Sequence, residues 1–266
     1  MTTRIAVSGA AGRMGRNVIG LVLDDSELEL VAALERPDHP DINRDAAVVA
    51  GRSEQCGVNV KASFDGDVDC FIVYSAPGPT VEVLQLAVAR KAAVVAGTTG
   101  LSPDQIEAFD EAAGSIPLVL APNTGVGANL LFKLAGEAAR ILGAGYDIEV
   151  VEAHHHNKAD APSGTALKLA ESAARARGLN IKENAVHGRS GRPGARPRDE
   201  IGIHAVRAGD IIGEHTIIYA TKGERIELTH RVTSREGFCR GALRAAKFLA
   251  GKPPGSYSMA TVLGLE

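Results

Sequence analysis

Short apolar runs recur along the first half of the chain, and each is followed by a turn signal and then, in most cases, by apolar residues at helical spacing. Runs with the length of buried strands lie at residues 5–8, 28–34, 70–74, 94–96 and 118–121. Helices are expected after the first run, at 80–91 and at 103–114, where Ser102 and Gln105 suit a capping box. Strands alternating with helices predict a doubly wound, Rossmann-like parallel sheet. Residues 37–66 are polar and turn-rich and indicate no clear element.

The pattern changes in the second half of the chain. A helix at 129–142 and a strand at 147–153 precede a helix that opens at Ser163 and stops at Gly178. Runs joined by short glycine-containing turns then predict consecutive strands of a mostly antiparallel sheet, at 201–208, 214–220 and 225–232. A last helix is expected at 238–250. The expected fold class is α/β, with a parallel Rossmann-like sheet and a smaller α+β domain.

Residues 188–200 hold four arginines among prolines and glycines, a composition typical of a mobile loop. These charges could attract an acidic ligand, although a solvated loop is the simpler interpretation.

Composition narrows the class of protein. With 266 residues and 45% hydrophobic content, the chain can bury one large core or two moderate ones. A formal net charge of -3 gives no global attraction to nucleic acid or to an anionic membrane. Three widely spaced cysteines, Cys56, Cys70 and Cys239, indicate neither a disulfide framework nor a thiolate zinc site. Without a recognisable signal peptide or membrane span, a cytoplasmic location is expected.

Three glycines, Gly9, Gly12 and Gly15, lie between the first strand and its helix. Such a turn lets a phosphate approach the backbone at a helix N-terminus, although a glycine motif alone also fits a plain turn. The second strand ends at Glu35 and Arg36, about 20 residues further on, where an acid can hold a ribose hydroxyl. Arg36 could instead meet a 2′-phosphate. The pattern therefore favours dinucleotide binding and leaves both NADH and NADPH open.

The stretch from Glu152 to Ala166 concentrates titratable groups between a strand and a helix start. A surface loop without a role is one interpretation. A metal site is another, because imidazole is a good ligand for transition metals. Successive side chains of an extended segment point to opposite faces, so His154 and His156 could share a ligand while His155 could not.

The same stretch also suits acid–base chemistry on an anionic substrate held at an interdomain cleft. Ser163, Gly164 and Thr165 lie where a helix N-terminus presents unpaired N–H groups, which suits a carboxylate. Ser163 can equally be the helix cap, and the two roles are compatible. Lys158 offers a positive charge or a proton, and a histidine can exchange protons near neutral pH.

This stretch, E-A-H-H-H-N-K-A-D-A-P-S-G-T-A, closely resembles the signature of the 4-hydroxy-tetrahydrodipicolinate (dihydrodipicolinate) reductase family. The similarity also includes the Gly9–Gly15 turn, Glu35-Arg36, residues 97–100 and residues 205–215, so it spans nearly the whole chain. It implies that NADH or NADPH reduces a small cyclic dicarboxylate in the diaminopimelate route to lysine. By this resemblance His154 is a proton donor or acceptor and Lys158 is a second proton donor.

The resemblance implies further contacts. His155 and Gly164-Thr165, with the adjacent Ser163, correspond to substrate-binding residues. Residues that correspond to cofactor contacts are Gly9, Ala10, Ala11, Gly12, Arg13, Met14, Glu35, Arg36, Gly97, Thr98, Thr99, Ala121, Pro122, Asn123, Thr124 and Arg235. Thr124 departs from the family pattern, because many members carry an aromatic residue there.

The family's organisation implies a dinucleotide-binding domain at 1–125 and 235–266 and a substrate-binding and oligomerisation domain at 126–234. It also implies a homotetramer. No metal, nucleic acid or membrane partner is expected. Two other functions remain to be weighed: a nucleotide-sensing regulator without catalysis, and a metal-dependent hydrolase built on His154 and His156.

Overall fold

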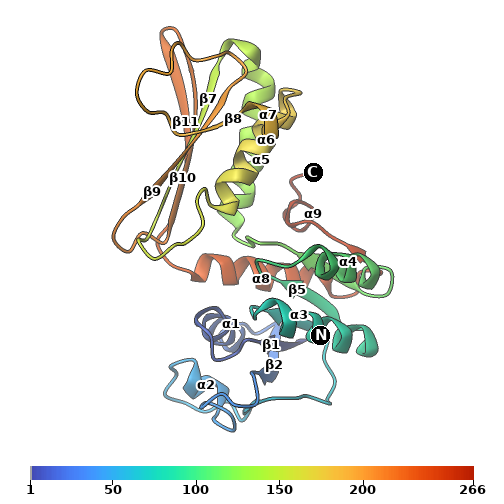
Figure 1. Ribbon diagram of the computed structural model, residues 1–266. Coiled ribbons are helices and arrows are strands. Elements are labelled where there is room, and N and C mark those ends of the chain that lie inside the picture. The colour runs from blue at the N-terminus through green and yellow to red at the C-terminus, as the bar shows by residue number, and fades with distance from the viewer. Residues whose placement is uncertain (1) are drawn as a thin grey trace. The chain divides into compact units, whose positions relative to one another are not determined.

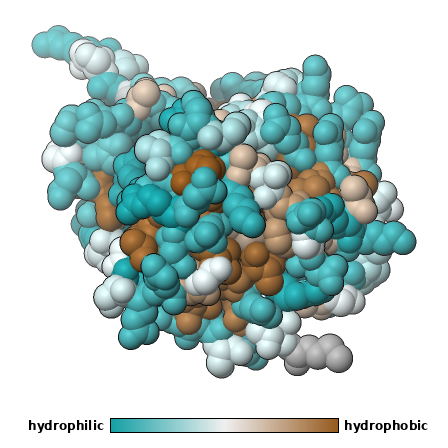
Figure 2. Space-filling view, turned by 90° about the horizontal axis from the view of Figure 1, so that it is seen from below, coloured by the Kyte–Doolittle hydropathy of each residue, from teal (hydrophilic) through white to brown (hydrophobic). Residues whose placement is uncertain are grey.

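The computed structural model of the chain describes residues 2–266. Its contacts divide it into two compact units: the first comprises the chain up to Val126 together with Arg235–Glu266, and the second comprises Gly127–Ser234. Within residues 2–266, every helix is too short or too polar to cross a membrane. Figure 2 shows hydrophilic residues over most of one face, with smaller hydrophobic areas between them.

A seven-stranded sheet forms the centre of the first unit, in the order β12-β6-β5-β4-β1-β2-β3, and its neighbouring strands are all parallel. The chain runs from β1 to β2 and β3 on one side and then returns to place β4 on the other side of β1. The crevice beyond β1 and β4 is therefore the switch point at which such sheets bind ligands. The predicted parallel α/β fold is confirmed. Its strands are β1 (Thr3–Ser8), β2 (Leu28–Leu34), β3 (Val60–Lys61), β4 (Cys70–Val73), β5 (Ala93–Ala96), β6 (Pro117–Leu120) and β12 (Gly255–Ser256).

Helices cover both faces of this sheet (Figure 1), and the alternation of side chains along each strand explains how. In β1, Ile5 and Val7 pack in one cluster with α1 and α8, while Ala6 packs in the other with α3 and α4. Every strand buried on both sides reads as a continuous apolar run. The helices are α1 (Arg13–Leu23), α2 (Ala46–Val49), α3 (Pro77–Arg90), α4 (Pro103–Ala112), α8 (Glu236–Leu249) and α9 (Met259–Leu263).

Some predicted bounds in this unit are wrong. Helix α3 begins at Pro77 and not near residue 80, because proline is well tolerated in the first turn, where no intrahelical N–H bond is needed. The polar segment 37–66 contains α2 and β3, and β12 and α9 follow the last predicted helix. These elements are too short for a hydrophobic period to develop. The capping box of α4 is confirmed, with Ser102 and Gln105 bonded reciprocally.

The second unit contains a five-stranded sheet in the order β11-β10-β7-β9-β8. Strand β10 pairs antiparallel with β11 and with β7, whereas β9 pairs in parallel with β7 and with β8. Strands β9 and β10 are therefore consecutive in sequence but not neighbours in the sheet. The predicted mostly antiparallel character of this sheet is confirmed. Its strands are β7 (Asp147–His154), β8 (Ala185–His187), β9 (Ile201–Arg207), β10 (Gly213–Thr221) and β11 (Glu224–Val232).

Figure 1 shows α5 (Val126–Leu142) and α6 (Gly164–Ala176) together along this sheet. Both helices bury an apolar stripe against it, with Leu131 and Ala135 of α5 and Leu169 and Ala173 of α6 in one core with Ile148, Val150, Ile203, Ile217 and Tyr219. The short elements η1 (Gly143–Gly145) and α7 (Ile181–Asn184) complete the unit.

The arginine-containing segment 188–200 has no regular structure, but it is not a freely solvated loop. Arg189 and Arg196 both bond to Glu149 on β7, at 2.7 and 2.8 Å. Arg189 also pairs with Glu200, and Arg196 with Asp147 at 3.0 Å. These two guanidinium groups anchor the segment to the sheet, so the suggestion that they attract an acidic ligand is not supported.

Candidate active site

Strand β7 positions a buried carboxylate beside a buried imidazole. Glu152 and His154 are two residues apart and therefore point to the same face of the strand. Glu152 is 0% exposed and His154 only 8%. Nδ1 of His154 lies 2.5 Å from Oε2 of Glu152. The sequence prediction singled out His154 but assigned no role to its partner.

Glu152 has three further hydrogen-bond donors around it. Arg207, from the neighbouring strand β9, donates from its two terminal nitrogens to the two carboxylate oxygens, each at 2.8 Å. The backbone N–H of Ser163 donates to Oε1 at 3.0 Å. A carboxylate that receives only donors is an ionised, acceptor-only group.

The titration of this pair follows from two opposed effects. Burial disfavours the charged carboxylate, but the bonds from Arg207, His154 and Ser163 outweigh it, so the pKa of Glu152 lies below its usual value. Burial also disfavours an imidazolium and lowers the pKa of His154 despite the contrary pull of Glu152. His154 is therefore mainly neutral at neutral pH, with an ionised partner at Nδ1.

The helix start next to this pair is closed by Ser163, which is the N-cap of α6. Its Oγ accepts the N–H of Ala166 at 3.1 Å, and Gly164 and Thr165 occupy the first turn. The predicted capping role is thus confirmed. The same Oγ lies 3.0 Å from Nε2 of His215 on β10.

His215 extends the network across the sheet. It is 3% exposed, and its ring meets that of His154 edge-on with centroids 5.1 Å apart. Burial, followed by the charge that His154 carries when it is protonated, lowers the pKa of His215 to about 3. His215 is thus a neutral neighbour that packs between the helix cap and the imidazole of His154.

Lys158 follows β7 in the loop before α6. Its Nζ bonds to both carboxylate oxygens of Asp160, at 2.8 and 2.9 Å. This contact, ahead of the opposing effect of burial, holds the pKa of Asp160 below its usual value. Arg207 donates to the backbone oxygen of Asp160 at 2.6 Å, so the loop that carries Lys158 is tied to the Glu152 network.

The other histidines of the stretch stand apart from this network. His155 buries its Nδ1 without a hydrogen-bond partner. Nδ1 of His156 lies 3.0 Å from the carbonyl oxygen of Gly209. Across residues 2–266, no group of three or more histidine, cysteine or carboxylate side chains is arranged to hold a metal ion. His154 and His156 therefore gain no third ligand, and the metal-dependent hydrolase finds no support.

In the first unit, the glycine turn lies at the switch point of the sheet. Gly9 has φ +76°, and a β-carbon there would come within 2.4 Å of the carbonyl oxygen of Tyr74, which follows β4. A β-carbon at Gly15 would come within 2.1 Å of the carbonyl oxygen of Gly9. The turn is thus packed too tightly for side chains, and Gly12 and Arg13 are exposed at the start of α1. Met14 is half-buried behind them.

The acid that ends β2 reaches back to this turn. Oε2 of Glu35 accepts the N–H of Ala11 at 3.1 Å, and its Oε1 accepts the N–H of Arg36 at 3.1 Å. Arg36 is exposed and pairs with Asp38 at 3.4 Å. Glu35 and Arg36 are therefore beside the turn, as a dinucleotide site requires.

The remaining predicted cofactor residues follow β5 and β6, with Arg235 at the start of α8. Gly97 approaches the ring of Tyr74, and a β-carbon there would come within 2.2 Å of it. Thr98 is buried and bonds to Thr80, whereas Thr99 is exposed. Ala121 is buried, Pro122 is exposed, and the carboxamide of Asn123 accepts the N–H of Gly125. Arg235 is half-buried and is the N-cap residue of α8.

Thr124 is turned inward. Its Oγ1 lies 2.8 Å from the hydroxyl of Tyr74 and donates to the carbonyl oxygen of Phe238 at 2.7 Å. Its side chain is only 2% exposed, so a ligand contact at this position is left to the backbone.

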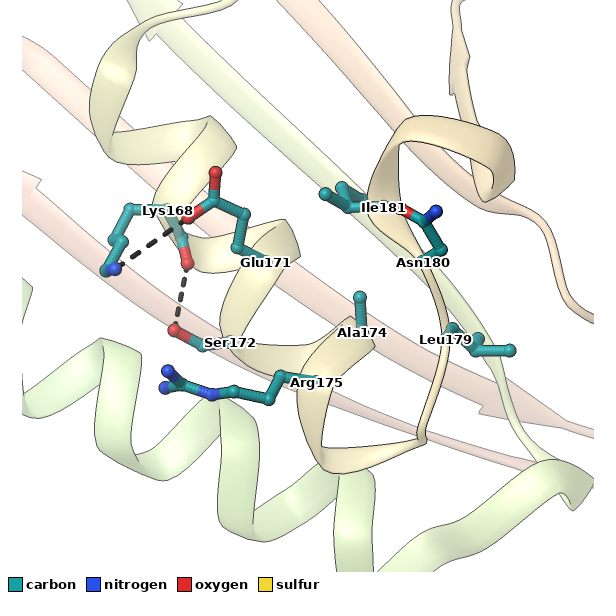
Figure 3. Close-up of a pocket in the computed structure, with 8 residues that line it drawn as sticks. All are labelled: Lys168, Glu171, Ser172, Ala174, Arg175, Leu179, Asn180 and Ile181. Atoms are coloured by element: carbon teal, nitrogen blue, oxygen red, sulfur yellow. Dashed lines mark hydrogen bonds and ion pairs between the residues drawn. The ribbon is translucent and has the colours of Figure 1, made fainter.

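The cavity in Figure 3, about 260 Å³ in volume, lies at the far end of α6 from Ser163. Its lining includes the ion pair of Lys168 with Glu171 and the hydroxyl of Ser172, which donates to the carbonyl oxygen of Lys168. None of the predicted site residues lines it, so we attach no catalytic role to it.

Sequence reasoning assigned no role to three members of the network, Glu152, Arg207 and His215. Glu152 starts the histidine stretch, and an acid two residues before a histidine on a strand predicts a shared face. Arg207 and His215 lie in the segment 205–215 that contributed to the family resemblance, but nothing in the sequence indicated what they contact.

Comparison with known proteins identifies the family. The family described as dihydrodipicolinate reductase, N-terminus, matches residues 3–124, and its C-terminal counterpart matches residues 127–263. A 4-hydroxy-tetrahydrodipicolinate reductase of Alkalilimnicola ehrlichii is 50% identical over 100% of both chains. One from Syntrophotalea carbinolica is 46% identical over 99% of both.

A solved structure agrees with this assignment. The dipicolinate-bound dihydrodipicolinate reductase of Paenisporosarcina sp. TG-14 is 26% identical and superposes with a TM-score of 0.76, over 98% of this chain and 99% of the other. With both family regions matched and full-length relatives at such identity, the chain belongs to the dihydrodipicolinate reductase family of nicotinamide-dependent oxidoreductases.

Proposed function

We propose that this chain catalyses the NAD(P)H-dependent reduction of 4-hydroxy-tetrahydrodipicolinate to tetrahydrodipicolinate, in the diaminopimelate route to lysine. Family membership supports the reaction. The observation that carries its chemistry is the buried Glu152–His154 pair beside the N-terminus of α6. A nucleotide-sensing regulator would not need an acid–base pair of this kind.

The proposed proton chemistry belongs to His154 and Lys158. With Nδ1 of His154 bonded to Glu152, its Nε2 is the nitrogen that exchanges a proton with the substrate. Lys158 is the second proton donor, and its ammonium group leaves Asp160 or is shared with it when substrate binds.

The proposed substrate contacts surround the start of α6. The N–H groups of Gly164 and Thr165 and the positive end of the helix dipole suit one carboxylate of a cyclic dicarboxylate. His155 is assigned to the same ligand, and Ser163 supports the turn. The reductase of known structure with bound dipicolinate supports this substrate class.

The residues of the first unit fit a dinucleotide. Gly9 and Gly15 pack against protein backbone and so hold the turn tightly at the exposed start of α1, where a pyrophosphate would bind. Glu35 bonds to this turn, and Arg36 follows it in the chain. A bound nicotinamide supplies the hydride. Residues proposed to hold the nucleotide are those from Gly9 to Met14, Glu35, Arg36, Gly97 to Thr99, Ala121 to Thr124 and Arg235. Both NADH and NADPH are retained, because Glu35 suits one and Arg36 the other.

Steady-state kinetics with freshly prepared 4-hydroxy-tetrahydrodipicolinate test this proposal. Purified protein is expected to oxidise NADH or NADPH only when this substrate is present. Tight nucleotide binding without turnover of either nucleotide would instead identify the regulator.

Two wider assignments follow from the family alone. We propose a cytoplasmic homotetramer, assembled through the sheet of the second unit. Sedimentation at micromolar concentration checks the assembly, and a monomer there would contradict it.

A further inference from the structure

The hydrogen bonds around Glu152 show which groups donate and which accept. It is 0% exposed, and the groups within bonding distance are the two terminal nitrogens of Arg207, the backbone N–H of Ser163 and Nδ1 of His154. The arginine nitrogens and the backbone N–H can only donate. A buried carboxylate with these neighbours is ionised and can only accept.

This fixes the proton of the neighbouring imidazole. An ionised Glu152 requires an N–H on Nδ1 of His154, because a bare nitrogen 2.5 Å from a carboxylate oxygen would bring two lone pairs together. The neutral ring then carries its lone pair on Nε2. That nitrogen faces Gly213, where a β-carbon would lie 3.1 Å away.

We infer that Glu152 is a positioning residue for the reduction: it holds His154 as the Nδ1–H tautomer and thereby assigns Nε2 to proton exchange with the substrate. The inference rests on the proposed function for its kinetic consequences, but not for the tautomer itself. Arg207 contributes to this positioning, because its positive charge keeps the buried Glu152 ionised.

The second oxygen of Glu152 serves the substrate side of the site. Oε1 accepts the N–H of Ser163, whose side chain caps α6. One carboxylate therefore orients both the proton-exchanging imidazole and the helix start that is proposed to bind a carboxylate of the substrate. Removing it would disturb kcat through His154 and KM through α6.

The diagnostic substitution is Glu152→Gln. The amide keeps the shape of the side chain, but an NH₂ at the Oε1 position would face two donors, Ser163 N–H and Nη2 of Arg207. The stable arrangement therefore places the amide oxygen there and the NH₂ at the Oε2 position, where it faces His154 and Nη1 of Arg207. The ring must then accept at Nδ1 and carry its proton on Nε2. An equivalent amide substitution at the orienting acid of a serine-protease triad costs about 10⁴ in kcat. For an imidazole that exchanges protons at Nε2 and shares the proton chemistry with Lys158, we expect kcat to fall about 100-fold.

Glu149 provides a matched control on the same strand. Like Glu152, it bonds to arginine and to a histidine: Arg189 and Arg196 donate three N–H groups to it, and Nε2 of His204 lies 2.7 Å away. It lies three residues from Glu152, on the opposite face of the strand. Glu149→Gln removes similar interactions and is expected to leave kcat within about twofold of the parent at neutral pH, once circular dichroism shows both variants folded.

A conservative variant separates positioning from packing. Glu152→Asp retains the charge but shortens the side chain, whereas Glu152→Gln retains the size but not the charge. Positioning by charge predicts that Asp keeps more of kcat than Gln. The reverse order, or an unchanged kcat in Glu152→Gln, would overturn the inference.

Nitrogen-15 NMR of the histidine rings tests the tautomer without any turnover. The parent protein is expected to show His154 protonated at Nδ1, and Glu152→Gln to show it protonated at Nε2. If the parent does not reduce the substrate, but its His154 is protonated at Nδ1 and that of Glu152→Gln at Nε2, the proposed function fails and the assignment of the tautomer to Glu152 stands. A parent His154 protonated at Nε2 would refute the inference even in an active enzyme.

The pH profile gives a second readout. The charged and titratable groups that face His154 are Glu152 on β7, Arg207 on β9, His215 on β10 and Lys158 in the loop after β7. Loss of the Glu152 charge leaves the other cations unopposed. The limb of the kcat/KM profile assigned to His154 is therefore expected to move to lower pH in Glu152→Gln and to stay in place in Glu149→Gln.

Discussion

Gly213 on β10 leaves just enough room for the imidazole of His154 on β7. A β-carbon at position 213 would lie 3.1 Å from Nε2 of His154 and 3.4 Å from its Cδ2. Because Nδ1 is fixed to Glu152, the ring cannot rotate away without breaking that hydrogen bond. Because Gly213 has no side chain, Nε2 of His154, the nitrogen proposed to exchange a proton, keeps its position without a steric clash.

Replacing Gly213 by alanine should test this contact. The imidazole would have to shift by a few tenths of an ångström, and we expect kcat to fall about 10-fold, since catalysis is sensitive to small displacements of reacting groups. Nucleotide affinity should not change. Gly145→Ala is the matched control, because a β-carbon there meets nothing within 4 Å. Equal kcat for both variants would show that the ring has room to adapt.

His154→Ala and Lys158→Ala should each lower kcat far more than they weaken nucleotide binding. Loss of a positioned proton donor or acceptor typically costs 10²–10⁴ in rate. Steady-state kinetics and fluorescence titration with the reduced nucleotide separate the two effects. A parallel loss of nucleotide affinity would contradict the roles proposed for these side chains.

Arg36→Ala should distinguish the two nucleotides. The exposed guanidinium of Arg36, whose partner is Asp38, can meet a 2′-phosphate, while Glu35 stays bonded to Ala11 and can hold a ribose hydroxyl. We expect KM for NADPH to rise about 10-fold, equivalent to about 1.4 kcal/mol, with little change for NADH. Arg140→Ala removes a comparable exposed arginine, bonded to Glu137, and serves as control. An equal rise for both nucleotides would exclude Arg36 as a 2′-phosphate contact.

The Glu149 cluster should make stability depend on acid pH. Burial opposes ionisation of Glu149, but Arg189, Arg196 and His204 outweigh it and lower its pKa from 4.5 to about 2. Because the folded pKa is depressed, the stabilisation is complete above pH 4.5 and is lost as pH falls from 4.5 through about 2. At about 1.4 kcal/mol per pKa unit, this stabilisation is on the order of 3 kcal/mol.

Urea unfolding of the parent and of Glu149→Gln between pH 2 and 7 measures this contribution. The difference in unfolding free energy between the two proteins should be largest near neutrality and should shrink below pH 4.5. A difference that does not vary with pH would mean that ionisation of Glu149 contributes nothing.

Much of the first unit follows from local patterns. Strands buried on both faces are continuous apolar runs, so β4 and β5 could be located without knowing their neighbours. The start of α4 could be located as well, because Ser102 and Gln105 satisfy each other's backbone groups within one turn. Elements of only a few residues, such as α2 and β12, show no period and could not be found this way.

The order of strands in the second sheet was not predictable in this way. Strands β9 and β10 follow each other in sequence, yet β7 lies between them, because hydrophobic alternation specifies which face of a strand is buried but not which strand is its neighbour. That insertion brings Arg207 and His215 to either side of Glu152.

For the candidate site, the sequence by itself determined the local part: His154 on a strand end, Lys158 in the following loop and Ser163 at a helix start, all within 10 consecutive positions. Only the tertiary structure decided how His154 is held. Its partner Glu152 is kept ionised and held in one orientation by Arg207, which is 55 positions away in the chain. Hydrogen bonds over such separations depend on strand register, which forms only when the whole sheet has assembled.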